Sequence, residues 1–141
     1  MKDSQTSPVA SPSPVMGLYD IPMWESIRAH QMALQKCASC GSMHFPPSPV
    51  CPQCLCQDQS WTTLGGQGVI MSWAVFHRAY LPAYPPPYNV IVVKLDEGPL
   101  MVSNLEGPEP LGSWIGQSVK LVYVTLPDGL ILPRFVLDNV P

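Results

Sequence analysis

The stretch CASCGSMHFPPSPVCPQC, from Cys37 to Cys54, holds four of the five cysteines in a chain of 141 residues. The four form two Cys-x-x-Cys pairs separated by ten residues. Two such pairs can surround one metal ion with four thiolates, whereas a redox dithiol needs only one pair. We therefore predict a structural metal site made of Cys37, Cys40, Cys51 and Cys54. Zinc is the preferred ion, and iron, which suits the same ligands in rubredoxin, is the alternative.

The fifth cysteine leaves one alternative open for the fourth ligand. The sequence CPQCLC offers either Cys54 or Cys56. Cys54 keeps the two-residue spacing and is preferred, so Cys56 is expected to be a free thiol. His44 lies inside the stretch and is expected to be a loop residue, because four cysteines already complete a tetrahedral site.

The amino-acid composition indicates which kinds of partner and which cellular compartment to expect. The formal net charge is −3, and the seven basic residues are scattered, which disfavours binding to nucleic acid. No run approaches the roughly 18 apolar residues of a membrane span, and the first residues lack an apolar signal-peptide core. We expect a cytoplasmic protein without a membrane partner, in which cysteine pairs hold metal more often than they form disulfides.

The region before the cysteines divides into two parts. Residues 1–16 are rich in serine and proline and predict a flexible tail. Residues 17–36 predict an N-terminal helical segment, with the helix itself over 21–35. Asp20 is a plausible N-cap and Pro22 falls in the first turn.

The region after the cysteines is rich in β-branched and aromatic residues. Strands are predicted at 69–80, 88–95, 100–105, 118–126 and 130–137. Turns containing Glu-Gly at 97–98 and Asp-Gly at 128–129 separate two pairs of these strands. We predict a mainly β chain, with a zinc ribbon over 37–60 and a five-stranded OB-fold barrel over 61–141. Spacing alone also allows a small sandwich.

An ordered set of short motifs extends this interpretation to nearly the whole chain. It comprises Trp24-Glu25, Cys37-x-x-Cys40-Gly41, Phe45-Pro46-Pro47, Cys51-Pro52-x-Cys54, Trp61, Gly66-x-Gly68-Val69, Ser72-Trp73, Pro87-Tyr88, Leu95-Asp96-Glu97-Gly98, Ile115-Gly116 and Val119. With these motifs in this order, the chain resembles the zinc-ribbon/OB-fold family of acyl-CoA-associated proteins, formerly a domain of unknown function.

The resemblance implies a role that depends on a partner. Members of this family accompany thiolases, thiolase-like aldolases or acyltransferases, and the large partner carries the catalytic residues. The resemblance therefore implies a non-catalytic accessory subunit that stabilises a thiolase-like large subunit. It also implies an acyl-CoA site at their shared interface.

The sequence allows three other functions to be compared with this one. Catalysis by the chain alone needs a nucleophile, a base and an orienting group, and the sequence gives no reason to bring His30, His44 and His77 together. A single-stranded nucleic-acid-binding OB-fold protein is the first alternative, supported by the barrel aromatics but not by a basic groove. A rubredoxin-like electron carrier is the second.

Five aromatic residues are candidate contacts for a ligand or partner. The segment AYLPAYPPPY, residues 79–88, is stiffened by prolines and presents tyrosines, so it suits a partner groove or an acyl chain. A plain rigid connector explains it equally well. The candidates are Trp24 on the predicted helix and Trp73, His77, Tyr84 and Tyr88 on or beside the barrel.

Overall fold

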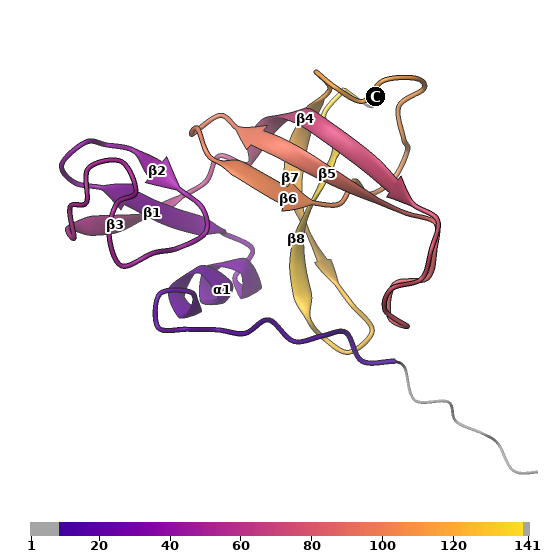
Figure 1. The fold of residues 1–141 in the computed structure, drawn as a ribbon, viewed down its shortest axis with the longest axis horizontal. Coiled ribbons are helices and arrows are strands. Elements are labelled where there is room, and N and C mark those ends of the chain that lie inside the picture. The colour runs from indigo at the N-terminus through magenta and orange to yellow at the C-terminus, as the bar shows by residue number, and fades with distance from the viewer. Residues whose placement is uncertain (1–8, 140–141) are drawn as a thin grey trace, which may run out of the picture.

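The computed structural model describes residues 9–139 (Figure 1). The predicted tail over 1–16 falls partly on residues 1–8, which lie outside the described residues. Within 9–139 the elements are α1 (Ile21–Arg28), β1 (Ala33–Cys37), β2 (Met43–His44), β3 (Gln59–Thr63), β4 (Gln67–Phe76), β5 (Tyr88–Leu95), β6 (Leu100–Ser103), β7 (Ser118–Thr125) and β8 (Ile131–Leu137). No helix in this range is long and apolar enough to cross a membrane.

The C-terminal half is one curled antiparallel sheet of five strands, in the order β6-β5-β4-β7-β8. The two edge strands approach each other through a bridge between Leu105 and Phe135 and through a hydrogen bond from Ser103 Oγ to the carbonyl of Pro133 (2.8 Å). The curl needs a sharp bend in β4, which a β-bulge between Ile70 and Ser72 provides. The predicted five-stranded OB-fold is confirmed in the form of a half-barrel, and the sandwich alternative is wrong.

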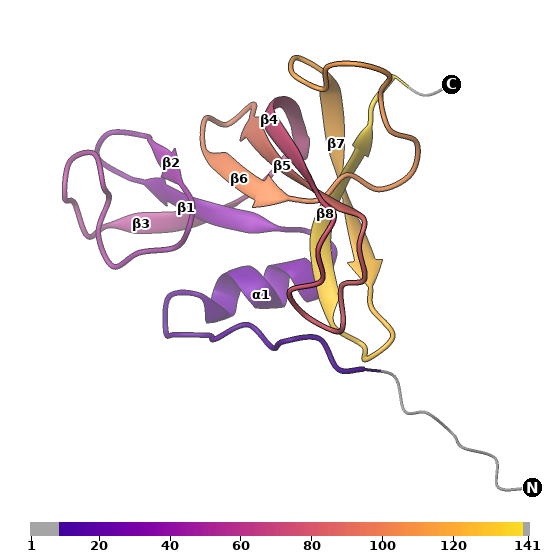
Figure 2. The same ribbon diagram turned by 45° about the vertical axis from the view of Figure 1, so that its right-hand side comes forward.

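The core lies inside this curl and continues to the helix. Phe135, Ile70, Ile91 and Val119 are fully buried between the strands. Ile27 of α1 is also fully buried, and it joins the same apolar cluster. The helix packs against β1 and β8, so it connects the two sheets (Figures 1 and 2).

The predicted helix over 21–35 is wrong in its second half. The helix ends at Arg28, because His30 adopts a left-handed backbone conformation (φ 58°). The amide of His30 donates to the carbonyl of Ile27 (2.9 Å), and the amide of Gln31 donates to the carbonyl of Ser26 (2.9 Å). This pair of bonds is a Schellman C-cap, in which glycine usually takes the place of His30.

The residues after the helix form a strand of the smaller sheet. That sheet has the order β2-β1-β3, and β1 pairs in full with β3, from Ala33 opposite Thr63 to Cys37 opposite Gln59. Figures 1 and 2 show this sheet beside the barrel, with α1 below it. The strand ends at Cys37, so the pairing with β3 fixes the start of the first cysteine turn.

Candidate metal centre and adjacent cavities

The two cysteine turns repeat the same backbone hydrogen bonds. The carbonyl of Cys37 accepts from the amide of Gly41 (3.0 Å), and the carbonyl of Cys51 accepts from the amide of Leu55 (2.8 Å). The amide of each first cysteine donates to the carbonyl five residues later, at 2.9 Å in both turns. Each turn requires a positive φ just after its second cysteine, which Gly41 (72°) and Leu55 (65°) supply.

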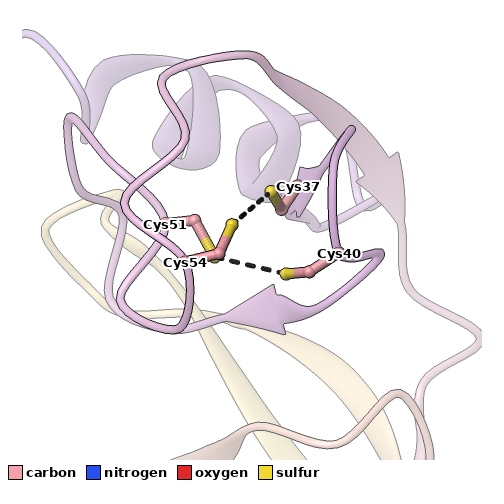
Figure 3. Close-up of side chains that lie close together, drawn as sticks. All are labelled: Cys37, Cys40, Cys51 and Cys54. Atoms are coloured by element: carbon pink, nitrogen blue, oxygen red, sulfur yellow. Dashed lines mark hydrogen bonds between the residues drawn. The ribbon is translucent and has the colours of Figure 1, made fainter.

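The four sulfur atoms of these turns converge on one point (Figure 3). All four lie within 4.8 Å of one another, with 3.5 Å between the sulfurs of Cys37 and Cys54 and 3.6 Å between those of Cys40 and Cys51. Tetrahedral zinc with Zn–S bonds of about 2.3 Å holds its sulfurs about 3.8 Å apart. The donor set and its spacing therefore fit a tetrahedral thiophilic ion.

The electrostatics of the cluster also favour a cation. The backbone amide of Cys40 lowers the pKa of Cys37 to about 6. The amide of Cys56 lowers the pKa of Cys54, but the sulfur of Cys37 and burial oppose it and raise that pKa to about 12. One thiolate thus suppresses ionisation of its neighbour, and a bound cation would remove this repulsion.

Cys54, and not Cys56, completes the cluster. The carbonyl of Cys56 accepts the amide of Cys51, so its backbone holds the second turn together as the carbonyl of Ser42 holds the first. Its sulfur lies 4.0 Å from the carbonyl of Asp58 and outside the group of four. Cys54, the residue preferred for its two-residue spacing, is therefore the one that the structure places with the other three.

His44 takes part in a buried network beside the cysteines. The amide of Ser48 donates to Gln35 Oε1 (2.8 Å), which identifies that atom as the oxygen. His44 Nε2, 2.8 Å from the same oxygen, must then carry its hydrogen, and burial lowers the pKa of His44. Ser48 Oγ is 3.2 Å from Nε2, but a protonated nitrogen cannot act as its base. The network positions the ribbon loop and does not activate a nucleophile.

A cavity of about 670 Å³ lies at the mouth of the barrel. It is bounded by the loop after β4 and by the turn between β7 and β8. His77, Tyr84 and Tyr88 all line it, so three of the predicted contact residues meet there. Tyr88 also stacks on Phe76, with ring centroids 5.2 Å apart.

The polar side of this cavity comes from residues that the sequence did not single out. Arg134 of β8 pairs with Glu106, and the Nδ2 atom of Asn89 lies 3.4 Å from Glu109 Oε1. These four residues line the cavity with two carboxylates and one cation that is already paired. They come from three separate chain segments without a motif, so only the topology reveals them.

The two predicted tryptophans lie elsewhere. Trp24 is half-buried and lines a second cavity of about 250 Å³ between α1, β6 and β8, together with Phe45 of the ribbon. Trp73 packs against the core and stacks on Trp114, with centroids 5.9 Å apart. Neither lines the cavity at the barrel mouth.

Comparisons with known proteins match both halves of this architecture. The family model described as ChsH2, rubredoxin-like zinc ribbon domain, matches residues 24–56. The family model described as ChsH2, C-terminal OB-fold domain, matches residues 61–124. Together the two models cover the second part of the helix, the cysteine turns, the strands β4, β5 and β6, and nearly all of β7.

Curated relatives include enzyme subunits and scaffold proteins. A "Probable enoyl-CoA hydratase alpha subunit" of Thermomonospora curvata is 33% identical over 88% of this chain, and the "3-oxo-4,17-pregnadiene-20-carboxyl-CoA hydratase alpha subunit" of Mycobacterium tuberculosis is 30% identical over 74%. The match spans only 39% and 33% of those two relatives. A "DUF35 domain-containing scaffold protein" of Pyrococcus furiosus is 31% identical over 69% of this chain and 74% of its own length.

Solved structures show the same arrangement. A chain of the structure titled "Ltp2-ChsH2(DUF35) aldolase" has a TM-score of 0.80 and 32% identity, and the match covers 89% of this chain and 98% of that one. A DUF35 protein of unknown function from Sulfolobus solfataricus has a TM-score of 0.64 at 14% identity, which shows the shared fold. The chain belongs to the DUF35 family of proteins that join a rubredoxin-like zinc ribbon to an OB-fold domain.

Proposed function

We propose that this chain is a non-catalytic accessory subunit of an enzyme that acts on acyl-CoA thioesters, and that its large partner is a thiolase-like or aldolase-type subunit. The observation that carries the proposal is the match to nearly all of one chain in the Ltp2-ChsH2(DUF35) aldolase structure. The hydratase alpha subunits among the relatives, whose names specify CoA thioesters, support the substrate class.

The chemistry of the described residues supports a non-catalytic role. His30 stacks on Tyr123, with ring centroids 4.9 Å apart, and His44 is committed to Gln35. His77 lines the large cavity, but none of the hydrogen bonds found within residues 9–139 joins it to a nucleophile or an orienting carboxylate. The catalytic groups of the complex would then come from the partner.

The cavity at the barrel mouth is the proposed contact with substrate. Tyrosine and proline side chains form its apolar wall, which suits an acyl chain or the neutral pantetheine arm. Glu106 and Glu109 line it, and the one arginine in the wall is paired with Glu106. Because those carboxylates repel phosphate, the nucleotide end of CoA would lie on the partner.

The metal has a structural role in this proposal. Zinc held by Cys37, Cys40, Cys51 and Cys54 would have no open position for substrate. It would instead fix the two cysteine turns and hence the ribbon beside α1. The cytoplasmic location predicted from the sequence remains part of the proposal.

Co-purification tests the proposal. The chain is tagged in its native host, recovered partners are identified by mass spectrometry, and the complex is assayed with a panel of acyl-CoA thioesters. A stoichiometric thiolase-like or aldolase-type subunit, active in the complex and not in the isolated chain, is the expected result. Recovery of nucleic acid, or of an iron-containing redox protein as the sole partner, would overturn it.

Substitution of the cavity tyrosines tests the substrate contact. The double variant Tyr84→Ala/Tyr88→Ala is expected to lower kcat/KM of the complex by about tenfold, the loss of about 1.4 kcal/mol of binding. The partner should still bind it as tightly as the original chain. Tyr19→Ala, an exposed tyrosine outside the cavity, is the matched control and should leave both quantities unchanged.

A further inference from the structure

The strands β4, β5 and β6 present an apolar surface on the side away from the core. Ile91, Val93 and Met101 point into the barrel and are buried. The alternate residues therefore point outward, and cross-strand pairs place them side by side. We call this surface the outer face; it consists of Val69, Ser72, Ala74, Val90, Val92, Lys94, Leu100 and Val102.

The outer face is apolar where solvent would favour polar side chains. Val102 is 61% exposed and Leu100 is 54% exposed. Val92 lies between Val102 on one side and Ser72 on the other in a single cross-strand row. An antiparallel sheet with one solvated face normally alternates apolar-in and polar-out, so the neighbouring valines and leucine on β5 and β6 mark an interaction surface on its outer side.

No described helix or strand packs on this side of β4 and β5, and only Val102, at the edge of the face, also lines the cavity of about 250 Å³ next to α1. The helix α1 packs against β1 and β8, and Figures 1 and 2 show it on the inner side of the sheet. At one end the outer face meets the ribbon, where Leu100 shares a shallow groove with Met43 and Phe45. Polar side chains, including Glu97 and Gln53, also line this groove, so the apolar surface ends where the barrel meets the cysteine module.

The outer face carries one positive charge and no acidic residue. Lys94 lies on β5, the middle strand of the three, and pairs across the ladder with Leu100. The nearest carboxylates in sequence are in the turn beyond it, and Glu97 there accepts a hydrogen bond from the amide of Gly65 (2.7 Å). Within residues 9–139, the ion pair formed is that of Arg134 with Glu106, so Lys94 has no charged partner.

This charge distribution argues against a second copy of the chain as the occupant. In a twofold interface centred on Val92, Lys94 would face either Lys94 or Val90 of the other copy, depending on the direction of the axis. Neither arrangement offers a carboxylate, and an unpaired ammonium group would be buried at a cost of several kcal/mol. A different protein can provide the missing acidic group.

We propose that the outer face is the docking surface for the catalytic subunit, through an apolar patch on that subunit that carries a carboxylate opposite Lys94. This inference rests on the proposed function and assigns the surface that the function requires. The barrel mouth lies at the far end of the same strands, beyond Asn89 and Val90. Docking here would leave that cavity open beside the partner.

The experiment uses the large subunit recovered by co-purification and measures its affinity for purified variants of this chain. Val102→Glu is expected to weaken binding at least about tenfold, since it buries a charge within the interface. Leu111→Glu is the matched control, because Leu111 is fully exposed (100%) and lies outside the outer face. The control should bind within about twofold of the original chain.

Two variants of Lys94 test the predicted carboxylate. Lys94→Glu is expected to weaken binding more than Lys94→Met, because only the first places two like charges together. Melting temperatures of all variants, expected to be unchanged at these exposed positions, separate docking from folding. Equal affinities of Val102→Glu and Leu111→Glu would overturn the inference but leave the proposed function standing. Recovery of no acyl-CoA enzyme would overturn both the inference and the proposed function. If the isolated chain forms dimers and Val102→Glu dissociates them, the occupant of the outer face is a second copy of the chain, and the inference is wrong.

Discussion

At the scale of single residues, Gly68 on β4 lies where the backbone of β5 comes closest. A Cβ atom at this position would be 2.6 Å from Val93 Cγ1 and 2.7 Å from the carbonyl oxygen of Lys94. Gly68→Ala is therefore expected to push the strands apart and to lower the free energy of unfolding by roughly 1–3 kcal/mol in urea denaturation. In Gly65→Ala, the new Cβ meets only Glu97 Oε1, at 3.4 Å, so this control should stay within about 0.5 kcal/mol. Equal losses in the two variants would contradict the argument.

Leu55 is a second residue at which backbone conformation determines the outcome. It is 71% exposed, yet it holds φ at 65° to complete the second cysteine turn. Leu55→Gly is expected to raise the free energy of unfolding by roughly 0.5–1 kcal/mol, because the left-handed conformation is unfavourable for residues with a Cβ. Leu55→Ala removes the same side chain but keeps the Cβ, so thermal denaturation should show little change. A gain in both variants would point to side-chain exposure as the cause.

Positive φ at residues other than glycine marks a limit of sequence-based prediction. Gly41 adopts a φ of 72° in the first cysteine turn, a conformation that glycine takes without steric cost. Leu55 and His30 adopt the same conformation without a sequence signal. Their amides donate hydrogen bonds to neighbouring carbonyls, and these bonds and the surrounding fold hold the backbone in a way that the residue types do not encode.

At the scale of elements, the barrel strands were predictable and the end of the helix was not. The five predicted strands match β4 to β8 closely, because apolar runs separated by Gly-containing turns depend on local sequence. The segment after Arg28 contains good helix formers, so local propensity favoured a longer helix. Residues 33–37 instead pair with β3, which begins more than twenty residues later along the chain, and this tertiary contact overrides the propensity.

The ribbon is expected to depend on a bound metal, and a matched pair of cysteine variants tests this. Cys54→Ser removes a sulfur that lies 3.5 Å from Cys37, whereas Cys56→Ser changes a sulfur outside the cluster. Elemental analysis is expected to find about one zinc per chain in Cys56→Ser and a loss of zinc in Cys54→Ser. Cys54→Ser should also melt at a lower temperature than Cys56→Ser, since four ligands are needed for a closed site. Full zinc occupancy in Cys54→Ser would contradict the assignment, and iron in the original chain would correct the metal.

At the scale of the whole molecule, the metal site was predictable and the cavity was only partly so. Four cysteines within 18 residues predict a metal site from their spacing alone. The cavity wall combines His77 and Tyr84 of one loop with Glu109 and Arg134, which are far away in sequence. The tyrosine-rich loop could be recognised as a candidate contact from its sequence. The polar residues of the wall are brought together only by the curl of the sheet, so the sequence did not predict them. The outer face likewise requires the strand register, because alternation within one strand does not show which strands are neighbours.

The helix, the ribbon and the barrel meet at Tyr123, which makes this residue a test of how the parts hold together. Its hydroxyl oxygen accepts a hydrogen bond from the amide of Met32 (2.7 Å), just before β1, and its ring stacks on His30. Met32 is 1% exposed, so Tyr123→Phe would leave a buried amide without an acceptor. In urea denaturation at pH 8, the free energy of unfolding of Tyr123→Phe is expected to be lower than that of the original chain by roughly 1–3 kcal/mol.

The same residue predicts how stability changes in alkali. Burial raises the pKa of Tyr123 above its ordinary value of 10.0, so the folded state holds the phenolic proton more tightly than the unfolded chain does. Its contribution to stability is present below pH 10 and is lost as the pH rises through the folded-state pKa. As the pH rises above 10, the original chain should therefore lose stability more steeply than Tyr123→Phe, and the two should converge. Tyr80→Phe, which alters an exposed phenol, should instead follow the original chain. If the free energies of unfolding of the original chain and of Tyr123→Phe differ by the same amount across this range, the hydroxyl stabilises the junction but its ionisation is not disfavoured by folding.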